Sequence, residues 1–236
     1  MDAAPRPGRL RRTPAASVHL GSMLALTFAT GIIDAVGYLG LDRVFTGNMT
    51  GNVVVLGMAL AGGNGLPVVG PLVALVGFVA GASVAGRMLK GASAGWTHRV
   101  TGLFAVTATV ELAVGAGLLA GLSADDRPVR LAVITVVGAG MGVQAATARY
   151  LAVKDVPTVV VTSTLTGLAS DSVLGSGAGG TVRRVAAVAL IVAGAMAGAL
   201  LLRWGPAAGF LAAGVVTGLV AAGGAVLIRS QTWPRG

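Results

Sequence analysis

The chain has 236 residues, of which 55% are hydrophobic and only 11% are charged. So little charge cannot cover the surface of a soluble domain of this length, which excludes an ordinary soluble protein and indicates an integral membrane protein. Because the chain contains no cysteine, disulfides, thiolate metal sites and thiol nucleophiles are also excluded. The net charge of +9 is interpreted as basic residues kept on the cytoplasmic side, with no nucleic-acid partner.

The chain begins with a basic, proline-rich stretch, residues 1–17, which we expect to be a disordered cytoplasmic tail. A first membrane repeat is predicted over residues 18–122 and a second over residues 130–229. Each repeat contains three apolar segments of about 20 residues, the length needed to cross roughly 30 Å of hydrocarbon. Each also contains one short apolar segment that is headed by polar residues.

The first of these polar stretches is residues 45–52, with the sequence FTGNMTGN. A weaker echo follows at residues 161–167, VTSTLTG. In a bilayer, backbone groups that leave a helix need partners or a wet cavity. We therefore expect the rest of the chain to serve as a frame that holds these two stretches inside the membrane.

The second half of the chain repeats the first. Residues 38–44 (YLGLDRV) resemble residues 150–156 (YLAVKDV), a spacing of 112 residues, and Thr50-Gly51 matches Thr166-Gly167 at a spacing of 116. Repeated halves of this kind are common in transporters.

The distribution of basic residues distinguishes two topologies. If both short segments are re-entrant, six segments cross and 13 basic residues lie inside against 4 outside; if both cross, the division is 10 to 7. The first division satisfies the positive-inside rule better. The predicted fold is therefore an all-α membrane protein of two inverted repeats. It has about six transmembrane helices plus two short re-entrant or discontinuous segments, with both termini cytoplasmic.

The N-termini of the two short helices are expected to meet near the middle of the membrane, where their unpaired N–H groups favour a small polar or anionic solute. The alternative is that the polar side chains only cap helix ends and hydrogen-bond between helices. The candidate substrate-binding residues are Asp34, Thr46, Asn48, Thr50, Asn52, Gln144, Thr162, Thr164 and Thr166.

Asp34 and Glu111 are acidic residues well inside long apolar segments. A charged, unpaired carboxyl group there costs at least a few kcal/mol, so both are candidates for proton or ion coupling. The alternative is a neutral carboxyl group that holds helices together, or, for Asp34, a pair with Arg43. His19 and His98 only flank apolar segments, so we expect no metal site and no cofactor.

Three motifs resemble the YoaK-like family of bacterial membrane proteins. They are residues 31–39 (GIIDAVGYL), the TGNMTGN run at 46–52, and residues 142–146 (GVQAA) with 164–167 (TLTG). The resemblance covers about residues 17–228, although Ala145 stands where the family has asparagine. It implies a multi-pass protein of the bacterial plasma (inner) membrane and supplies no established substrate.

Two functions remain open from the residues alone. The first is a small-solute transporter or channel with a polar site at mid-membrane, and the second is a non-transporting scaffold or partner protein whose polar motifs only pack helices. An enzyme is not expected, because no nucleophile and base stand at a catalytic spacing. The lipid bilayer is the expected partner, and the sequence leaves open a homo-oligomer.

Overall fold

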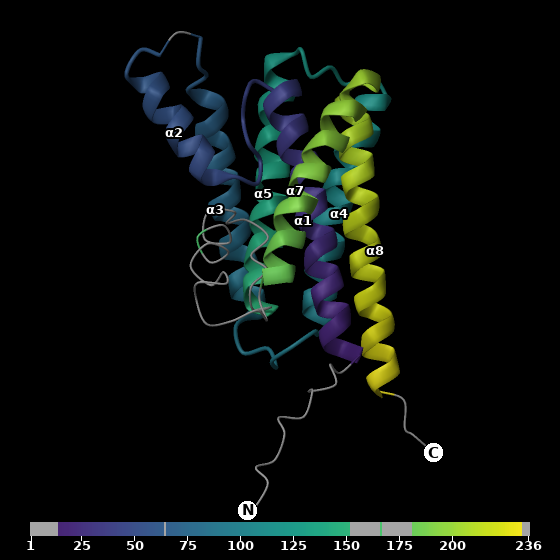
Figure 1. Ribbon diagram of the computed structural model, residues 1–236. Helices are drawn as coiled ribbons and strands as arrows, with labels where there is room; N and C mark the ends of the chain where they lie inside the picture. Colours follow the sequence, from purple (N-terminus) through teal and green to yellow (C-terminus); the bar gives the residue numbers. More distant parts are fainter. Residues whose placement is uncertain (1–13, 64, 152–165, 167–180, 233–236) are drawn as a thin grey trace, which may run out of the picture.

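The computed structural model describes residues 14–63, 65–151, 166 and 181–232 (Figure 1). No strand occurs among these residues, which confirms the all-α prediction. In chain order the helices are α1 (Pro14–Gly40), α2 (Met49–Leu60), α3 (Val69–Leu89), α4 (His98–Leu119), α5 (Arg127–Leu151), α7 (Thr181–Leu201), the 3-10 helix η1 (Leu202–Trp204) and α8 (Pro206–Thr232).

Six of the described helices are long and apolar enough to cross a membrane, with spans of 21 to 25 residues. At about 1.5 Å per residue, even the shortest of them reaches roughly 30 Å. α2 has 12 residues and is too short to cross. α1 ends and α3 begins at the same end of the molecule, so the chain between them, described for residues 41–63 and 65–68, forms a re-entrant segment (Figure 1). The second predicted short segment lies outside the described residues, apart from Thr166.

Local sequence explains several helix boundaries. α1 begins at Pro14, inside the predicted tail, because proline is well suited to the first position of a helix, where no N–H partner is needed. The Thr97 hydroxyl caps α4 by accepting the Val100 N–H at 3.4 Å. Gly205, with a φ of 97°, turns the chain into Pro206 at the start of α8.

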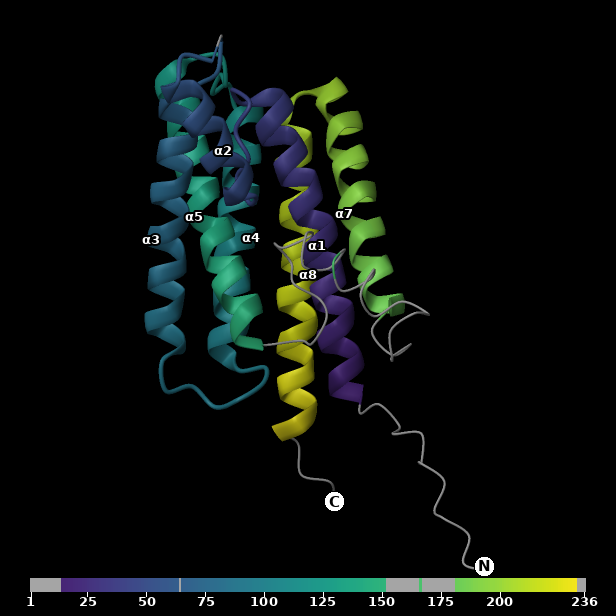
Figure 2. The ribbon, with the colours of Figure 1, turned by 60° about the vertical axis from the view of Figure 1, so that its left-hand side comes forward.

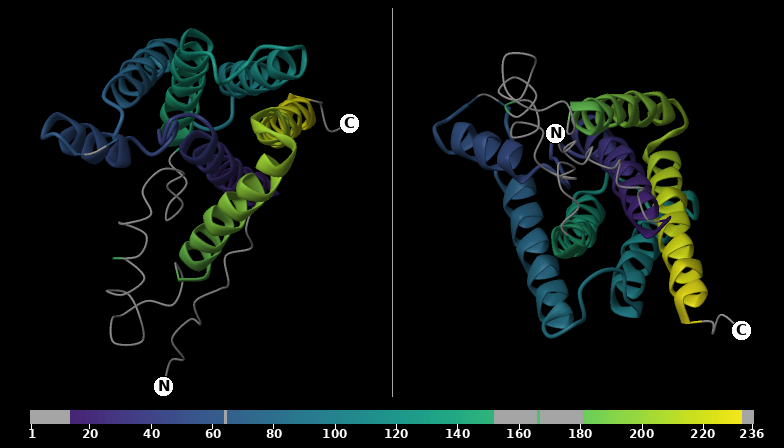
Figure 3. Two further views of the ribbon diagram at one scale, coloured as in Figure 1. Left: turned by 90° about the horizontal axis from the view of Figure 1, so that it is seen from above. Right: turned by 60° about the horizontal axis from the view of Figure 1, so that its bottom comes forward.

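The six long helices form two rows of three (Figure 3). In one row α5 packs between α3 and α4, and in the other α1 packs between α7 and α8. The rows are joined by extensive packing of α4 on α8, whereas α1 and α5 touch only slightly. α1, α4 and α7 run away from the end that carries both termini, and α3, α5 and α8 run toward it (Figures 1 and 2).

Glycine permits the closest helix crossings within each row. A Cβ added at Gly81 of α3 would overlap the Ala139 carbonyl of α5, and one at Gly194 of α7 would overlap the Phe28 carbonyl of α1. Without a side chain at these positions, the two backbones come into van der Waals contact, which is the main force between helices in lipid. The small residues of the sequence therefore set the row geometry.

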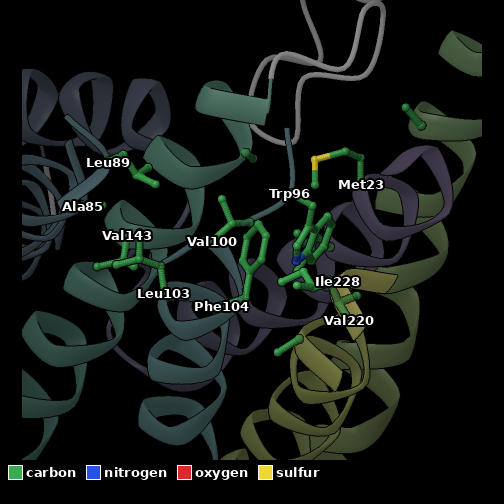
Figure 4. Packing of buried hydrophobic residues seen from close by; sticks show 14 residues of the cluster. Met23, Ala85, Leu89, Trp96, Val100, Leu103, Phe104, Val143, Val220 and Ile228 are labelled. Carbon is green, nitrogen blue, oxygen red and sulfur yellow. The ribbon is translucent and has the colours of Figure 1, made fainter. Parts of the chain in front are cut away.

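Buried side chains form two clusters, one toward each end of the bundle. At the end with the termini, Met23, Phe104 and Val220 surround Trp96 from the loop between α3 and α4 (Figure 4). The Trp96 indole N–H donates to the Thr101 hydroxyl at 2.8 Å, so its polar atom is satisfied inside the cluster. This cluster fixes the 90–97 loop against the membrane helices.

We predict that the end carrying both termini and the 90–97 loop is cytoplasmic, as the distribution of basic residues requires. Because the chain has no cysteine, a single introduced cysteine reports its side of the membrane without labelling of other cysteines in the protein. In intact cells, Ala94→Cys should resist a membrane-impermeant maleimide, and Asp126→Cys at the opposite end should react. Reaction of Ala94→Cys in intact cells would contradict this orientation, and reaction of both variants in broken cells is the control.

Candidate functional site

The re-entrant segment is held to α1 by one carboxyl oxygen. Asp34 Oδ1 accepts the backbone N–H groups of Thr46 at 3.0 Å, Gly47 at 2.7 Å and Asn48 at 3.3 Å. Asp34 makes no ion pair with Arg43 in the part of the chain that the structure describes, so that predicted alternative is not observed. Three successive amides on one oxygen form a small anion-binding nest that the protein's own side chain already fills.

The two asparagines of the segment also bond to their own loop. Asn52 is fully buried, and its amide both accepts the Phe45 N–H at 2.9 Å and donates to the Phe45 carbonyl. Asn48 is the N-cap of α2 and accepts the Gly51 N–H at 3.2 Å. These amides therefore satisfy the backbone of the segment, as the packing alternative predicted.

The segment reaches the middle of the bundle. A Cβ added at Gly47 would lie 3.0 Å from Met141 Cε of α5 and 3.1 Å from Thr30 Cγ2 of α1. Thr30 is the thirteenth residue of the 23-residue span Val18–Gly40, so it marks the midpoint of α1 in the membrane. The tip of the segment thus lies between the two rows, close to mid-membrane depth.

A polar bridge joins the two rows beside this tip. Gln144 of α5 donates from Nε2 to the Thr30 hydroxyl at 3.1 Å, and that hydroxyl donates to the Leu26 carbonyl at 2.8 Å. Gln144 is 1% exposed, and its Oε1 has no hydrogen-bond partner among the described residues. The fully buried Thr46 hydroxyl also lacks a partner there. Unsatisfied buried polar atoms are costly, and at this position they suggest a role in binding.

Glu111 is the second buried carboxyl group and lies in the α4–α8 interface. It is 1% exposed and lies beside Thr217 of α8. Neither the two carboxyl oxygens nor the Thr217 hydroxyl has a partner with hydrogen-bond geometry among the described residues. Glu111 and Thr217 are thus neighbours without a hydrogen bond. Asp34 and Glu111 therefore occupy separate interfaces.

The remaining predicted residues are placed as follows. Thr50 and Thr166 are exposed, while Thr162 and Thr164 lie outside the described residues. The described residues contain no group of three or more side chains arranged to hold a metal ion. Thr30 was not predicted; its one sequence signal is that it precedes Asp34 by four positions, on the same helix face.

We expect Asn48→Ala to lower the free energy of unfolding by about 1 kcal/mol, the usual cost of losing an N-cap. Asn48→Ser should keep most of the stability, because serine also caps helices. Thr50→Ala, two residues along on an exposed position, is the matched control and should leave the melting temperature in detergent unchanged. Equal melting of Asn48→Ala and wild type would contradict the capping role.

Comparison with known proteins agrees with this architecture. A family model described as a protein of unknown function, DUF1275, matches residues 22–223. The chain is 34% identical over 160 residues to the UPF0700 transmembrane protein YoaK of Bacillus subtilis (strain 168). The aligned region covers 66% of this chain and 68% of that protein. No solved structure matches.

Proposed function

The chain belongs to the DUF1275 family, and we propose that it carries a small polar solute across the bacterial plasma (inner) membrane between its two rows of helices. The observation that carries this proposal is Gln144, a buried amide beside the re-entrant segment whose carbonyl oxygen has no partner among the described residues. Irregular backbone at this depth is tolerated where it lines a cavity or is buried in protein, and transporter sites are often built in this way.

The proposal is supported by the duplicated packing of the helices. In this comparison α1 corresponds to α5, α3 to α7 and α4 to α8. The packed pair α3–α5 then corresponds to the packed pair α7–α1, and the pair α4–α5 to the pair α8–α1. Each helix runs opposite to its counterpart (Figure 1). We therefore propose two inverted repeats related by an axis in the membrane plane, with the solute site near that axis, between α1 and α5.

The atoms left free at the site favour a solute that donates hydrogen bonds. The loop N–H groups that could bind an anion already donate to Asp34, whereas Gln144 Oε1 is an acceptor without a partner in the part of the chain that the structure describes. The Thr46 hydroxyl can accept as well as donate. Ammonium-type, amide or hydroxyl-bearing solutes fit these groups better than the anionic solute that the helix N-termini alone suggest.

Glu111 is the candidate for proton or ion coupling in this proposal. Asp34 already bonds to three backbone amides, so a change in its charge would disturb the re-entrant segment itself. Both Glu111 oxygens are unpaired among the described residues and are therefore open to a proton or a cation.

A scaffold is the second candidate, and one observation favours it. The amides and backbone of residues 45–52 largely satisfy one another, as expected of a purely structural segment. A scaffold would need no solute access to Gln144. Measurements of solute flux through the protein and of water access to its centre therefore distinguish the two functions.

The experiment is uptake into proteoliposomes with labelled methylammonium, urea, glycerol and glucose, which donate hydrogen bonds, and with sulfate and chloride, which do not. We expect flux of at least one donor solute above empty liposomes. Gln144→Leu should abolish that flux at little cost in melting temperature, since it removes an unsatisfied oxygen together with one hydrogen bond and leaves the Thr30 hydroxyl bonded to the Leu26 carbonyl. Thr109→Val, on the exposed face of α4, is the control. Absence of donor-solute flux, or unchanged flux in Gln144→Leu, would contradict the proposal.

A further inference from the structure

A groove of about 690 Å³ lies between α3 and α5 at the end that carries both termini. Its walls are the last turns of the two helices, and it is lined by Ser83, Gly86, Arg87, Leu89, Lys90, Ala146, Arg149 and Tyr150. The Tyr150 hydroxyl donates to the Ser93 carbonyl at 2.6 Å, which ties the loop after α3 to the end of α5. The groove therefore has a defined wall on each side.

Three basic side chains in this groove have no hydrogen-bond or ion-pair partner among the described residues. The side chains of Arg87, Lys90 and Arg149 line it and make no hydrogen bond or ion pair with the residues that the structure describes. The carbonyls at the end of α3 are instead bonded by Arg99, which donates to Met88 at 3.0 Å and to Lys90 at 3.4 Å. Two helix C-termini contribute about −0.5 charge each, so three cations leave roughly +2.

The acidic residues that the structure describes lie elsewhere. Asp34 and Asp42 are near the other end of α1, Asp125 and Asp126 are in the loop before α5, and Glu111 is within α4. None of these carboxyl groups lies at the end where the groove opens (Figure 1). Among the residues that the structure describes, no carboxyl group therefore offsets the positive charge of the groove, which favours an anion.

An exposed apolar stripe on α3 runs directly into the groove. Leu72, Val76 and Val79 are 47%, 61% and 61% exposed. Their spacing continues through Ser83, Arg87 and Lys90 in steps of three or four residues, which places all six on one helix face. The stripe is long enough for part of an acyl chain, and it ends at the cations.

We infer that this groove binds the phosphate of an anionic phospholipid, with an acyl chain along the α3 stripe. Arg87, Lys90 and Arg149 hold the phosphate oxygens, and the Ser83 hydroxyl adds a hydrogen bond. A free phosphate has no use for the apolar stripe, and a zwitterionic lipid has a cation of its own that weakens the attraction. This site is separate from the mid-membrane polar centre and does not depend on solute transport.

Because α3 and α5 come from different halves of the chain, the bound lipid would bridge them. The two helices already cross closely through Gly81 and Ala139 above the groove. A lipid phosphate between Arg87 and Arg149 screens the repulsion of these cations at the open end of the pair. Lipid binding is therefore expected to raise the melting temperature of the whole protein.

The test is titration of the full-length protein in detergent with phosphatidylglycerol, followed by native mass spectrometry and thermal melting. We expect phosphatidylglycerol to bind and to raise the melting temperature, whereas phosphatidylcholine and inorganic phosphate at equal concentration should not. At about fivefold per charge, Arg87→Gln/Arg149→Gln should weaken phosphatidylglycerol binding roughly 30-fold. Arg127→Gln/Arg203→Gln, at the opposite end, is the matched control.

Equal binding of phosphatidylcholine and phosphatidylglycerol by the wild type would overturn the inference without any variant. Stabilisation by inorganic phosphate alone would assign the groove to a free anion instead of a lipid. Unchanged phosphatidylglycerol affinity in the Arg87/Arg149 variant would place the lipid elsewhere. If that double variant elutes as an aggregate, the single variants Arg87→Gln and Arg149→Gln should each lose about fivefold, and full affinity in both would equally overturn the site.

Discussion

Replacing Asp34 by alanine is expected to free residues 45–48 from α1 and to destabilise the protein more than any other single polar substitution considered. The side chain accepts three backbone N–H groups, at 3.0, 2.7 and 3.3 Å. Each buried donor left without a partner costs about 1–3 kcal/mol, so the loss is roughly 3 kcal/mol or more. Among the described residues, these three N–H groups donate to Asp34 Oδ1 and to no other acceptor.

Hydrogen–deuterium exchange of the peptide that contains residues 41–52 measures this effect directly. Wild type should protect these amides, Asp34→Ala should lose that protection, and Asp34→Asn should be intermediate because its amide oxygen still accepts. Asp42→Asn, an exposed site whose positive φ of 85° asparagine tolerates, is the control. Protected amides in Asp34→Ala would mean that Asp34 does not hold the segment.

A second large effect is expected at the crossing of α3 and α5. Gly81→Ala should lower the free energy of unfolding by about 1–3 kcal/mol, because its Cβ would overlap the Ala139 carbonyl and push the helices apart. Gly86→Ala, on the same helix, has open space around its added Cβ and should be neutral or slightly stabilising.

Melting in detergent compares the two variants, and Gly194→Ala tests the corresponding crossing in the other row. Gly194 meets the Phe28 carbonyl as Gly81 meets that of Ala139, so the two variants should lose similar stability. If Gly81→Ala and Gly86→Ala have the same melting temperature, the α3–α5 contact at Gly81 does not hold the row together.

The long helices were predictable from sequence because lipid imposes a simple requirement of length and hydropathy. The re-entrant position of residues 41–63 and 65–68 agrees with the topology that the sequence favoured, because that topology satisfies the positive-inside rule better. The Gly77/Gly81 and Gly194/Gly198 pairs are visible as small residues four apart. The length of a helix and the spacing of its small residues can be recognised from consecutive residues of the sequence, without knowledge of contacts between segments.

Contacts between distant segments were harder to predict. Asn52 reads as a candidate ligand, yet its amide bonds to Phe45, because an amide can satisfy its own loop as readily as a solute. The bond from Gln144 to Thr30 joins residues 114 apart and depends on how the rows meet.

The spacing of the sequence repeat differs from the spacing that the proposed exchange of halves gives. Tyr38 and Tyr150 suggest a spacing of 112. In contrast, Gly31 and Gly138, which pack against Ile191 and Ala74, correspond at a spacing of 107 under the proposed exchange of halves. The sequence similarity at Tyr38 and Tyr150 lies near helix ends. The register in which the helices pack depends instead on the positions of small residues such as glycine.

The most direct test of a solute site between the rows is access of a thiol reagent to Thr30→Cys. Thr30 is 2% exposed and is bonded by Gln144, and the wild-type chain offers no competing cysteine. The control is Ala29→Cys, the preceding residue, which is 1% exposed within the apolar core. We expect a small charged methanethiosulfonate to modify Thr30→Cys and to leave Ala29→Cys unmodified in membranes. Thr30→Cys that remains as unreactive as Ala29→Cys would mean a closed, dry centre and would contradict the transport account.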